Sequence, residues 1–194
     1  MLKKFPILTV TGPRQSGKTT LLTENFKDYR YYNMERIDFR RMFLSDPAGF
    51  LGGAGDKVIF DEAQHLKELF SYIQIASDAS GKTGQYILSG SQSFLLNESI
   101  AQSLAGRVNV NLLLPFDMTE LGDHYQRELS DTLFAGFYPR LIHREINPND
   151  FYPSYIQTYI ERDIRTLRAI DNLDAFIRFI GLCAGRTGQL LNLS

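Results

Sequence analysis

The sequence predicts an α/β fold, with a mostly parallel five-stranded sheet flanked by helices and followed by a small helical region. Up to about residue 117, short apolar runs alternate with segments of helical periodicity, which is typical of the βα units that build a parallel sheet. From about Met118 onward the segments have helical character, and no clear strand is visible. We therefore expect two domains, a core at residues 1–117 and a helical region at residues 118–194.

Five segments have the composition of strands, because they are short and rich in apolar, β-branched or aromatic residues. The first, FPILTVTG, lies between Pro6 and Gly12 and is apolar enough to be buried on both faces, as parallel strands are. The five expected strands span residues 5–12, 29–34, 57–64, 85–94 and 107–116.

Helical periodicity occupies the intervals between these strands. Residues 45–56 lack this continuous periodicity and look like a helix start followed by a glycine-rich turn. The expected helices of the core span residues 21–29, 36–43, 65–80 and 97–106, and those of the helical region lie within residues 118–143, 148–170 and 171–194.

Composition excludes several classes of protein. The chain has 21 Lys and Arg against 22 Asp and Glu, so it lacks a pervasive basic field for nucleic acid or acidic lipid. Its single cysteine, Cys183, cannot form an internal disulfide, and no Cys/His spacing indicates zinc. The N-terminus does not resemble a signal peptide, and no apolar run reaches the length of a membrane span. We expect a soluble cytoplasmic protein without a membrane partner.

The most informative motif is GPRQSGKT at residues 12–19, which matches G-x-x-x-x-G-K-T. Glycines let the backbone bend tightly so that N–H groups converge on phosphate oxygens, and a helix N-terminus adds partial positive charge. Lys18 is expected to reach the β- and γ-phosphates, and the Thr19 hydroxyl to ligate Mg²⁺. A plain glycine-rich turn with an exposed lysine is the alternative, but the strand before and the helix after favour a nucleoside triphosphate site. The expected binding residues are Gly12, Pro13, Arg14, Gln15, Ser16, Gly17, Lys18, Thr19 and Thr20.

A second motif, KVIFDEAQ, places Asp61 and Glu62 at the C-terminal end of a buried strand, where ligands bind in open α/β sheets. Asp61 is expected to hold Mg²⁺ opposite Thr19, and Glu62 to polarise an attacking water. The alternative is an acid pair that caps the following helix. Because a kinase gains nothing from an activated water beside the γ-phosphate, the pair favours hydrolysis over transfer to a small molecule.

Three further candidates rest on weaker signals. A hydroxyl of Ser89 or Ser91, at the end of the fourth strand, could contact the γ-phosphate or the attacking water, although serine is also a common strand terminator. Arg107, at the start of the fifth strand, could supply charge to a phosphoryl transition state in cis or across subunits. Its alternative is an ordinary surface arginine at a sheet edge.

The ordered motifs resemble those of a known family. GPRQSGKTTLL, VIFDEAQ, YILSGSQSFLL, SLAGR, GFYPR, YIQTYIERDIR and GRTGQLLNLS occur in this order along the chain. The pattern is similar to bacterial and archaeal ATP-binding proteins that have an AAA-like N-terminal domain followed by a DUF4143 region. The resemblance implies a P-loop NTPase core of the type with an additional catalytic glutamate, in which the fourth strand is inserted between the first and the third. It also implies ATP and Mg²⁺ as ligands of Lys18, Thr19 and Asp61, with Glu62 on the water and Ser89 or Ser91 at a sensor position.

Members of that family continue past GQLLNLS into a winged-helix-like segment and a C-terminal region. The apolar tail TGQLLNLS leads us to expect the same continuation here, with Leu190, Leu191 and Leu193 packed into it. The expected function is Mg²⁺-dependent hydrolysis of ATP to ADP and phosphate, used as a conformational switch for the C-terminal region. Nucleic acid contacted through that region, and a second copy of the chain, are the further partners considered. Two alternatives stay open: an ATP-binding interaction module with little hydrolysis, and a P-loop small-molecule kinase.

Overall fold

The computed structural model describes residues 2–91, 100, 102–122, 128–159 and 172–190. Its contacts divide the chain into two compact units, Met1–Pro148 and Asn149–Ser194. The expected domain boundary after residue 117 is a different kind of division, based on the last strand, and stays a prediction.

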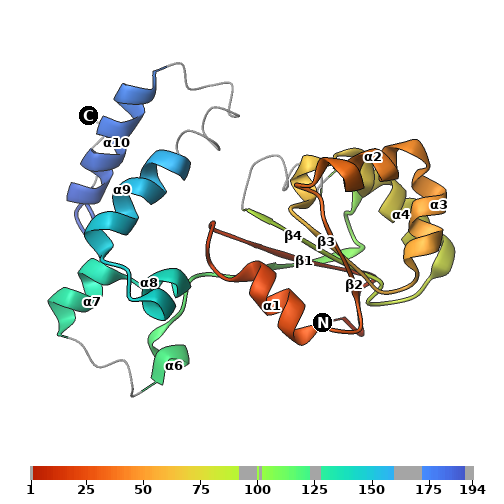
Figure 1. Cartoon of the computed structure of the whole chain (residues 1–194), viewed down its shortest axis with the longest axis horizontal. Helices are drawn as coiled ribbons and strands as arrows, with labels where there is room; N and C mark the ends of the chain where they lie inside the picture. The colour runs from red at the N-terminus through yellow and green to blue at the C-terminus, as the bar shows by residue number, and fades with distance from the viewer. Residues whose placement is uncertain (1, 92–99, 101, 123–127, 160–171, 191–194) are drawn as a thin grey trace. The chain divides into compact units, whose positions relative to one another are not determined.

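The first unit contains a five-stranded, all-parallel sheet with the strand order β2-β3-β4-β1-β5 (Figure 1). This confirms the expected α/β fold and the insertion of the fourth strand between the first and the third. β1 and β4 are buried along their whole length, as the apolar composition of central parallel strands requires. The strands are β1 Ile7–Gly12, β2 Arg30–Asn33, β3 Val58–Asp61, β4 Tyr86–Ser91 and β5 Val108–Leu112.

Helices flank both faces of this sheet (Figure 1). The segment expected to be a helix start and a turn is a complete helix, α3. Pro47 occupies its first turn and the Asp46 side chain caps it by accepting a hydrogen bond from the Gly49 N–H at 2.9 Å, so local capping outweighs three glycines within the helix. The helices up to β4 are α1 Lys18–Asn25, α2 Ile37–Ser45, α3 Pro47–Ala54, the 3₁₀ turn η1 Ala63–His65 and α4 Glu68–Ser80.

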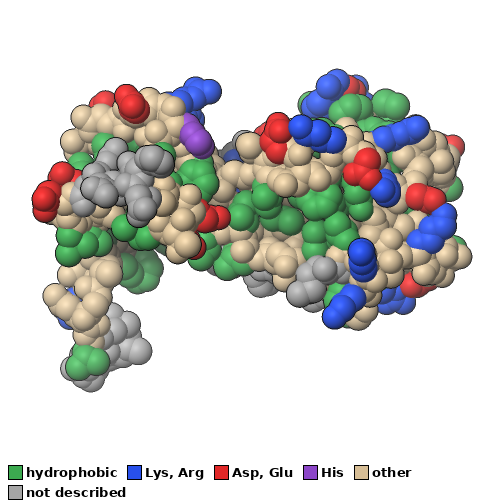
Figure 2. All heavy atoms as spheres, turned by 90° about the horizontal axis from the view of Figure 1, so that it is seen from below, with side chains coloured by type: hydrophobic (Ala, Val, Ile, Leu, Met, Phe, Trp, Pro, Cys, Tyr) green, Lys and Arg blue, Asp and Glu red, His purple; other side chains and the backbone are tan. Residues whose placement is uncertain are grey.

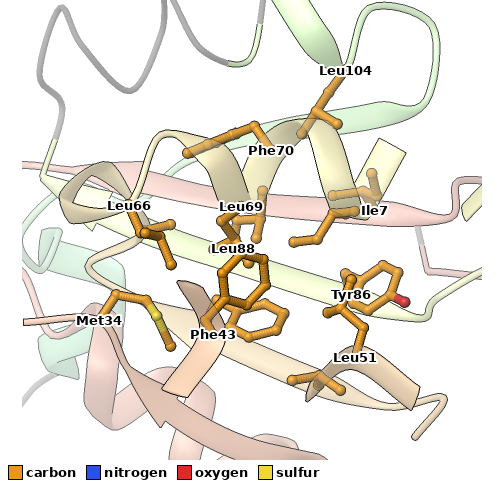
Figure 3. Close-up of a cluster of buried hydrophobic side chains, with 14 of the residues drawn as sticks. Ile7, Met34, Phe43, Leu51, Leu66, Leu69, Phe70, Tyr86, Leu88 and Leu104 are labelled. Atoms are coloured by element: carbon orange, nitrogen blue, oxygen red, sulfur yellow. The ribbon is translucent and has the colours of Figure 1, made fainter. Parts of the chain in front are cut away.

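The main core lies between the sheet and the helices α2, α3 and α4 (Figure 3). Alternate residues of each strand point to this face, so Ile7, Tyr86 and Leu88 meet Phe43 and Leu69 from the helices. The remaining strand residues point to the opposite face and pack around Leu22 of α1, in a cluster with Leu8, Val10, Ile59 and Ile87.

The face that carries α1 is less completely covered than the other. An apolar groove of about 780 Å³ lies beside α1. Its lining includes Leu8 and Val10 of β1, and Lys3 and Lys4 from the chain segment before β1. Figure 2, which views the molecule from the side of α1, shows hydrophobic side chains gathered on this part of the first unit. The groove lies beside the helix that follows the phosphate loop, and the loop itself is not part of its lining.

The helices after β5 are short in the first unit and longer in the second. Four of the expected helical segments include residues outside the described ranges, namely 97–99 and 101, 123–127, 160–170, and 171 with 191–194. Leu190 is 94% exposed, and Leu191 and Leu193 lie outside the described residues. In the described part of the chain, no helix has both the length and the apolar character needed to cross a bilayer. The helices that follow β5 are α6 Met118–Leu121, α7 Leu129–Ala135, α8 Pro139–Arg144, α9 Pro148–Tyr159 and α10 Leu173–Gly185.

Candidate functional site

The expected phosphate loop connects β1 to α1, and two glycines fix its path. A Cβ atom added to Gly12 would lie 2.0 Å from the carbonyl oxygen of Leu113, so no side chain fits there. Gly17 has φ +94°, a left-handed conformation that glycine adopts without steric cost. Gln15 also has a positive φ of 62°, which few residues other than glycine adopt. The backbone is thus held in a tight, specific curve before α1 begins at Lys18.

Lys18 is bound by the loop that precedes it. Its side chain is buried, and its Nζ donates hydrogen bonds to the carbonyl oxygens of Gly12 at 3.1 Å and Pro13 at 2.8 Å. Ser16 is also buried, and its Oγ has no hydrogen-bond partner among the described residues. A buried hydroxyl without a partner is costly, so the loop has an unsatisfied donor where an anion with oxygen acceptors would fit.

Asp61 is the centre of a hydrogen-bond network at the carboxyl end of the sheet. Its Oδ2 accepts from Thr19 Oγ1 at 2.7 Å and from the Tyr31 hydroxyl at 2.6 Å. Its Oδ1 accepts from Ser89 Oγ and from the Glu62 N–H at 3.1 Å. The carboxylate is almost fully buried, and these four donors compensate for the loss of water around it.

Glu62 follows at the end of β3 in an unusual backbone conformation. Its φ of 53° is left-handed, and it turns the chain from the strand into η1. The Glu62 Oε2 accepts a hydrogen bond from Gln64 Nε2 at 2.5 Å, and the same nitrogen lies 3.4 Å from Ser91 Oγ. The Gln64 Oε1 is buried without a hydrogen-bond partner among the described residues. Glu62, Gln64 and Ser91 therefore form a second polar group beside the Asp61 network.

Tyr31 and Gln64 are site residues that the sequence analysis missed. In the β2–β3 register Tyr31 lies opposite Ile59. Ile59 precedes Asp61 by two residues, so strand alternation places the side chains of Tyr31 and Asp61 on the same face, the one that carries α1. That signal becomes visible only once β2 is known to pair with β3. Burial, and then the hydrogen bond to Asp61, raise the pKa of Tyr31, so its hydroxyl remains a neutral donor. Gln64 carries no comparable signal, because a 3₁₀ turn sets its direction.

Arg107 is the expected site residue that the structure does not bring to this place. Its carbonyl oxygen accepts from the N–H of Ile7, at the start of β1, whereas the phosphate loop begins at the other end of that strand. Its guanidinium pairs with Asp78 through Nε–Oδ1 at 2.6 Å and Nη2–Oδ2 at 2.9 Å. This pairing lowers the pKa of Asp78 and raises that of Arg107. A role in the same molecule is therefore unsupported, and a role across subunits stays a prediction.

The residues that do meet fit a phosphate chain with a divalent cation. The loop offers backbone N–H groups, the Lys18 ammonium and the Ser16 hydroxyl to an anion. Thr19 and Asp61 offer the hard oxygen ligands that Mg²⁺ prefers. Among the described residues there is no group of three or more His, Cys, Asp or Glu that could hold a metal alone. A single carboxylate agrees with the way Mg²⁺ binds when phosphates and waters supply the remaining ligands.

Comparison with known proteins adds a family and a fold. A family model described as "AAA domain" matches residues 4–122, and a model described as a domain of unknown function (DUF8612) matches residues 126–194. Uncharacterized protein Mb2031c of Mycobacterium bovis and uncharacterized protein Rv2008c of Mycobacterium tuberculosis are each 29% identical over 170 residues. The alignment covers 86% of this chain and 38% of each relative, so the chain spans less than half of their length.

Among solved structures, the Walker-type ATPase paby2304 of Pyrococcus abyssi is similar, with a TM-score of 0.54 and 16% identity. The similarity covers 88% of this chain and 73% of that chain, and at this identity it shows the fold alone. It confirms the expected P-loop ATPase fold. The family model that matches residues 126–194 is DUF8612 and not the DUF4143 region that the resemblance implies. The DUF4143 region therefore stays a prediction.

Proposed function

The chain belongs to the AAA domain family, and from this we propose that it binds ATP with Mg²⁺ and hydrolyses it to ADP and phosphate. The observation that carries the proposal is the hydrogen bond of 2.7 Å from Thr19 Oγ1 to Asp61 Oδ2. It joins the first turn of α1, directly after the phosphate loop, to the acid pair at the end of β3. The groups that can donate hydrogen bonds to a phosphate and the groups that can bind a metal are therefore concentrated in one place.

Each residue has a distinct task in the proposed reaction. The loop N–H groups and Lys18 bind and orient the phosphate chain, while Thr19 and Asp61 provide oxygen ligands for the metal. Bound Mg²⁺ supplies positive charge that stabilises the phosphate oxygens as the bond breaks. Glu62 accepts the proton of the attacking water, and Gln64, which contacts both Glu62 and Ser91, restricts its side chain.

A second candidate function is an ATP-binding interaction module with little hydrolysis. The observation that favours it is the hydrogen bond from Gln64 to Glu62 Oε2, because a water could bind this oxygen only beside or in place of the Gln64 donor. The two functions share the phosphate loop and differ in whether Glu62 acts.

Three parts of the proposal concern regions or partners outside this chain. Use of hydrolysis as a conformational switch for a C-terminal region is supported by the resemblance to longer ATP-binding proteins. Contact with nucleic acid through such a region and assembly into a homo-oligomer have the same support. A full-length relative provides the test, by measuring its oligomeric state and its affinity for labelled nucleic acid with and without ATP.

The test of the proposed function compares the wild-type chain with Glu62→Gln. We expect the wild type to release phosphate from Mg-ATP and the variant to retain Mg-ATP binding while its rate falls by about 10²–10⁴-fold, since Glu62 acts as general base. Glu68→Gln, an exposed acid in the first turn of α4, is the matched control and should behave as wild type.

Binding without release by the wild type would favour the interaction module. Transfer of the phosphate to an added small molecule instead of water would indicate a kinase. Equal loss of nucleotide binding in Glu62→Gln would contradict the assignment of Glu62 as the base.

A further inference from the structure

We propose that Tyr31 is a positioning residue for the metal-binding carboxylate of Asp61. The proposal rests on the proposed function, because it assigns Asp61 to Mg²⁺ bound with the nucleotide. The observation behind it is the hydrogen bond of 2.6 Å from the Tyr31 hydroxyl to Asp61 Oδ2, the same oxygen that accepts from Thr19.

Tyr31 differs from the other donors in where it comes from. Thr19 belongs to the helix that follows the phosphate loop, and its hydroxyl is itself an expected metal ligand. Tyr31 lies on β2, at the edge of the sheet beyond β3, and does not belong to the loop or the acid pair. Its hydroxyl can therefore hold Asp61 in a constant orientation while the Thr19 oxygen is directed to the metal.

The ring of Tyr31 is held in place by the core beneath it. It packs against the cluster of buried residues on the face that carries α1, with Ile59 opposite it on the neighbouring strand. A tyrosine side chain has only two rotatable bonds before the ring, so a ring fixed in this way delivers its hydroxyl to one position. Hydrogen bonds from such outer donors orient the carboxylates that bind metals, and removing one donor typically costs about 10–100-fold in metal affinity or activity.

The experiment uses Tyr31→Phe, which deletes the hydroxyl and keeps the ring in the core. The matched control is Tyr29→Phe. The Tyr29 hydroxyl donates to the Gly84 carbonyl oxygen at 2.7 Å, and its ring packs against the same cluster, but it does not contact Asp61. Both variants lose one partly buried hydrogen bond, so a general effect on stability is common to the two.

Binding of a fluorescent ATP analogue is measured over a series of MgCl₂ concentrations and, separately, in EDTA. Thermal unfolding midpoints without nucleotide establish that both variants fold. In Tyr31→Phe we expect the Mg²⁺ concentration for half-maximal binding to rise about 10–100-fold, while affinity in EDTA stays at the wild-type value. In Tyr29→Phe both quantities should stay at the wild-type value.

An unchanged Mg²⁺ requirement in Tyr31→Phe would overturn the inference while leaving the proposed function intact. Equal shifts in the two variants would also overturn it, because they would show a structural effect of losing any tyrosine hydroxyl in this cluster. If the wild-type chain binds the analogue equally well with Mg²⁺ and with EDTA, the metal assignment of Asp61 fails, and the inference fails with it.

Discussion

Lys18 illustrates at the scale of one residue how the loop prepares for an anion. A buried ammonium is unfavourable unless it is hydrogen-bonded, and here two carbonyl oxygens of the loop compensate for lost water. Both carbonyl oxygens are neutral acceptors. A phosphate oxygen would be a stronger partner than a neutral carbonyl.

We expect Lys18→Ala to weaken ATP binding by about 10–100-fold, which is the value of a hydrogen bond to a charged group. The control is Lys27→Ala, because Lys27 lies just beyond the other end of α1 and pairs with exposed Glu24. Calorimetric titration with ATP measures both affinities. Wild-type affinity in Lys18→Ala would mean that the phosphate loop is a structural turn.

Residues of the site differ in how far the sequence reveals them. Gly12, Lys18 and Thr19 are visible because one motif fixes their spacing and their chemistry together. Tyr31 depends on which strand lies beside β3, a fact that no local pattern contains. The left-handed backbone of Glu62 costs about 1–3 kcal/mol for a residue other than glycine and is imposed by its surroundings rather than by its identity.

At the scale of the elements, the approach of β1 to the segment after β5 determines the start of the loop. The Leu113 N–H donates to the Thr11 carbonyl oxygen at 2.7 Å, and Gly12 lies directly against Leu113. The two segments can come this close because Gly12 has no side chain. The strand pair and the first residue of the loop are therefore coupled through one backbone contact.

Gly12→Ala should lower the free energy of unfolding by about 1–3 kcal/mol, as overpacking does, because its Cβ would overlap the Leu113 carbonyl oxygen. The contrasting substitution is Gly52→Ala within α3, where no atom lies within 4 Å of an added Cβ. It should raise the free energy of unfolding by about 0.5–1 kcal/mol, since glycine disfavours a helix interior. Urea unfolding of the two variants measures both changes, and a stable Gly12→Ala protein would contradict the close approach.

The elements themselves were largely predictable, and their exceptions have physical causes. The three central strands, β1, β3 and β4, were recognisable from apolar runs because they are buried on both faces. α3 was underestimated because its glycines suggested a turn, whereas Asp46 and Pro47 provide a strong helix start. Arg107 was assigned to the site although it directly precedes β5, and in a parallel sheet the start of a strand lies far from the phosphate loop.

At the scale of the whole molecule, the placement of Arg107 bears on whether one copy of the chain is sufficient for the proposed hydrolysis. Within one molecule its guanidinium is engaged by Asp78 at the amino edge of the sheet. Any contribution to phosphoryl transfer would then have to come from a neighbouring molecule, which makes it dependent on protein concentration.

We expect Arg107→Ala to match the wild type in ATP affinity and in turnover per molecule in dilute solution. Arg36→Ala is the control, because Arg36 is a second arginine that pairs with an aspartate, Asp38. Phosphate release is measured over a range of protein concentrations. A wild-type rate that rises with concentration, and a loss of that rise in Arg107→Ala alone, would assign the arginine to a site on a second copy.

The strand order has a consequence for when the candidate nucleotide site forms during folding. Gly12 of β1 lies opposite Ser91 of β4, and β4 is also the strand that separates β1 from β3. The loop and Asp61 can therefore meet only after a strand from later in the chain has inserted between them. Because such long-range pairing forms late and slowly, we expect refolding chains to regain helical signal before they can bind nucleotide.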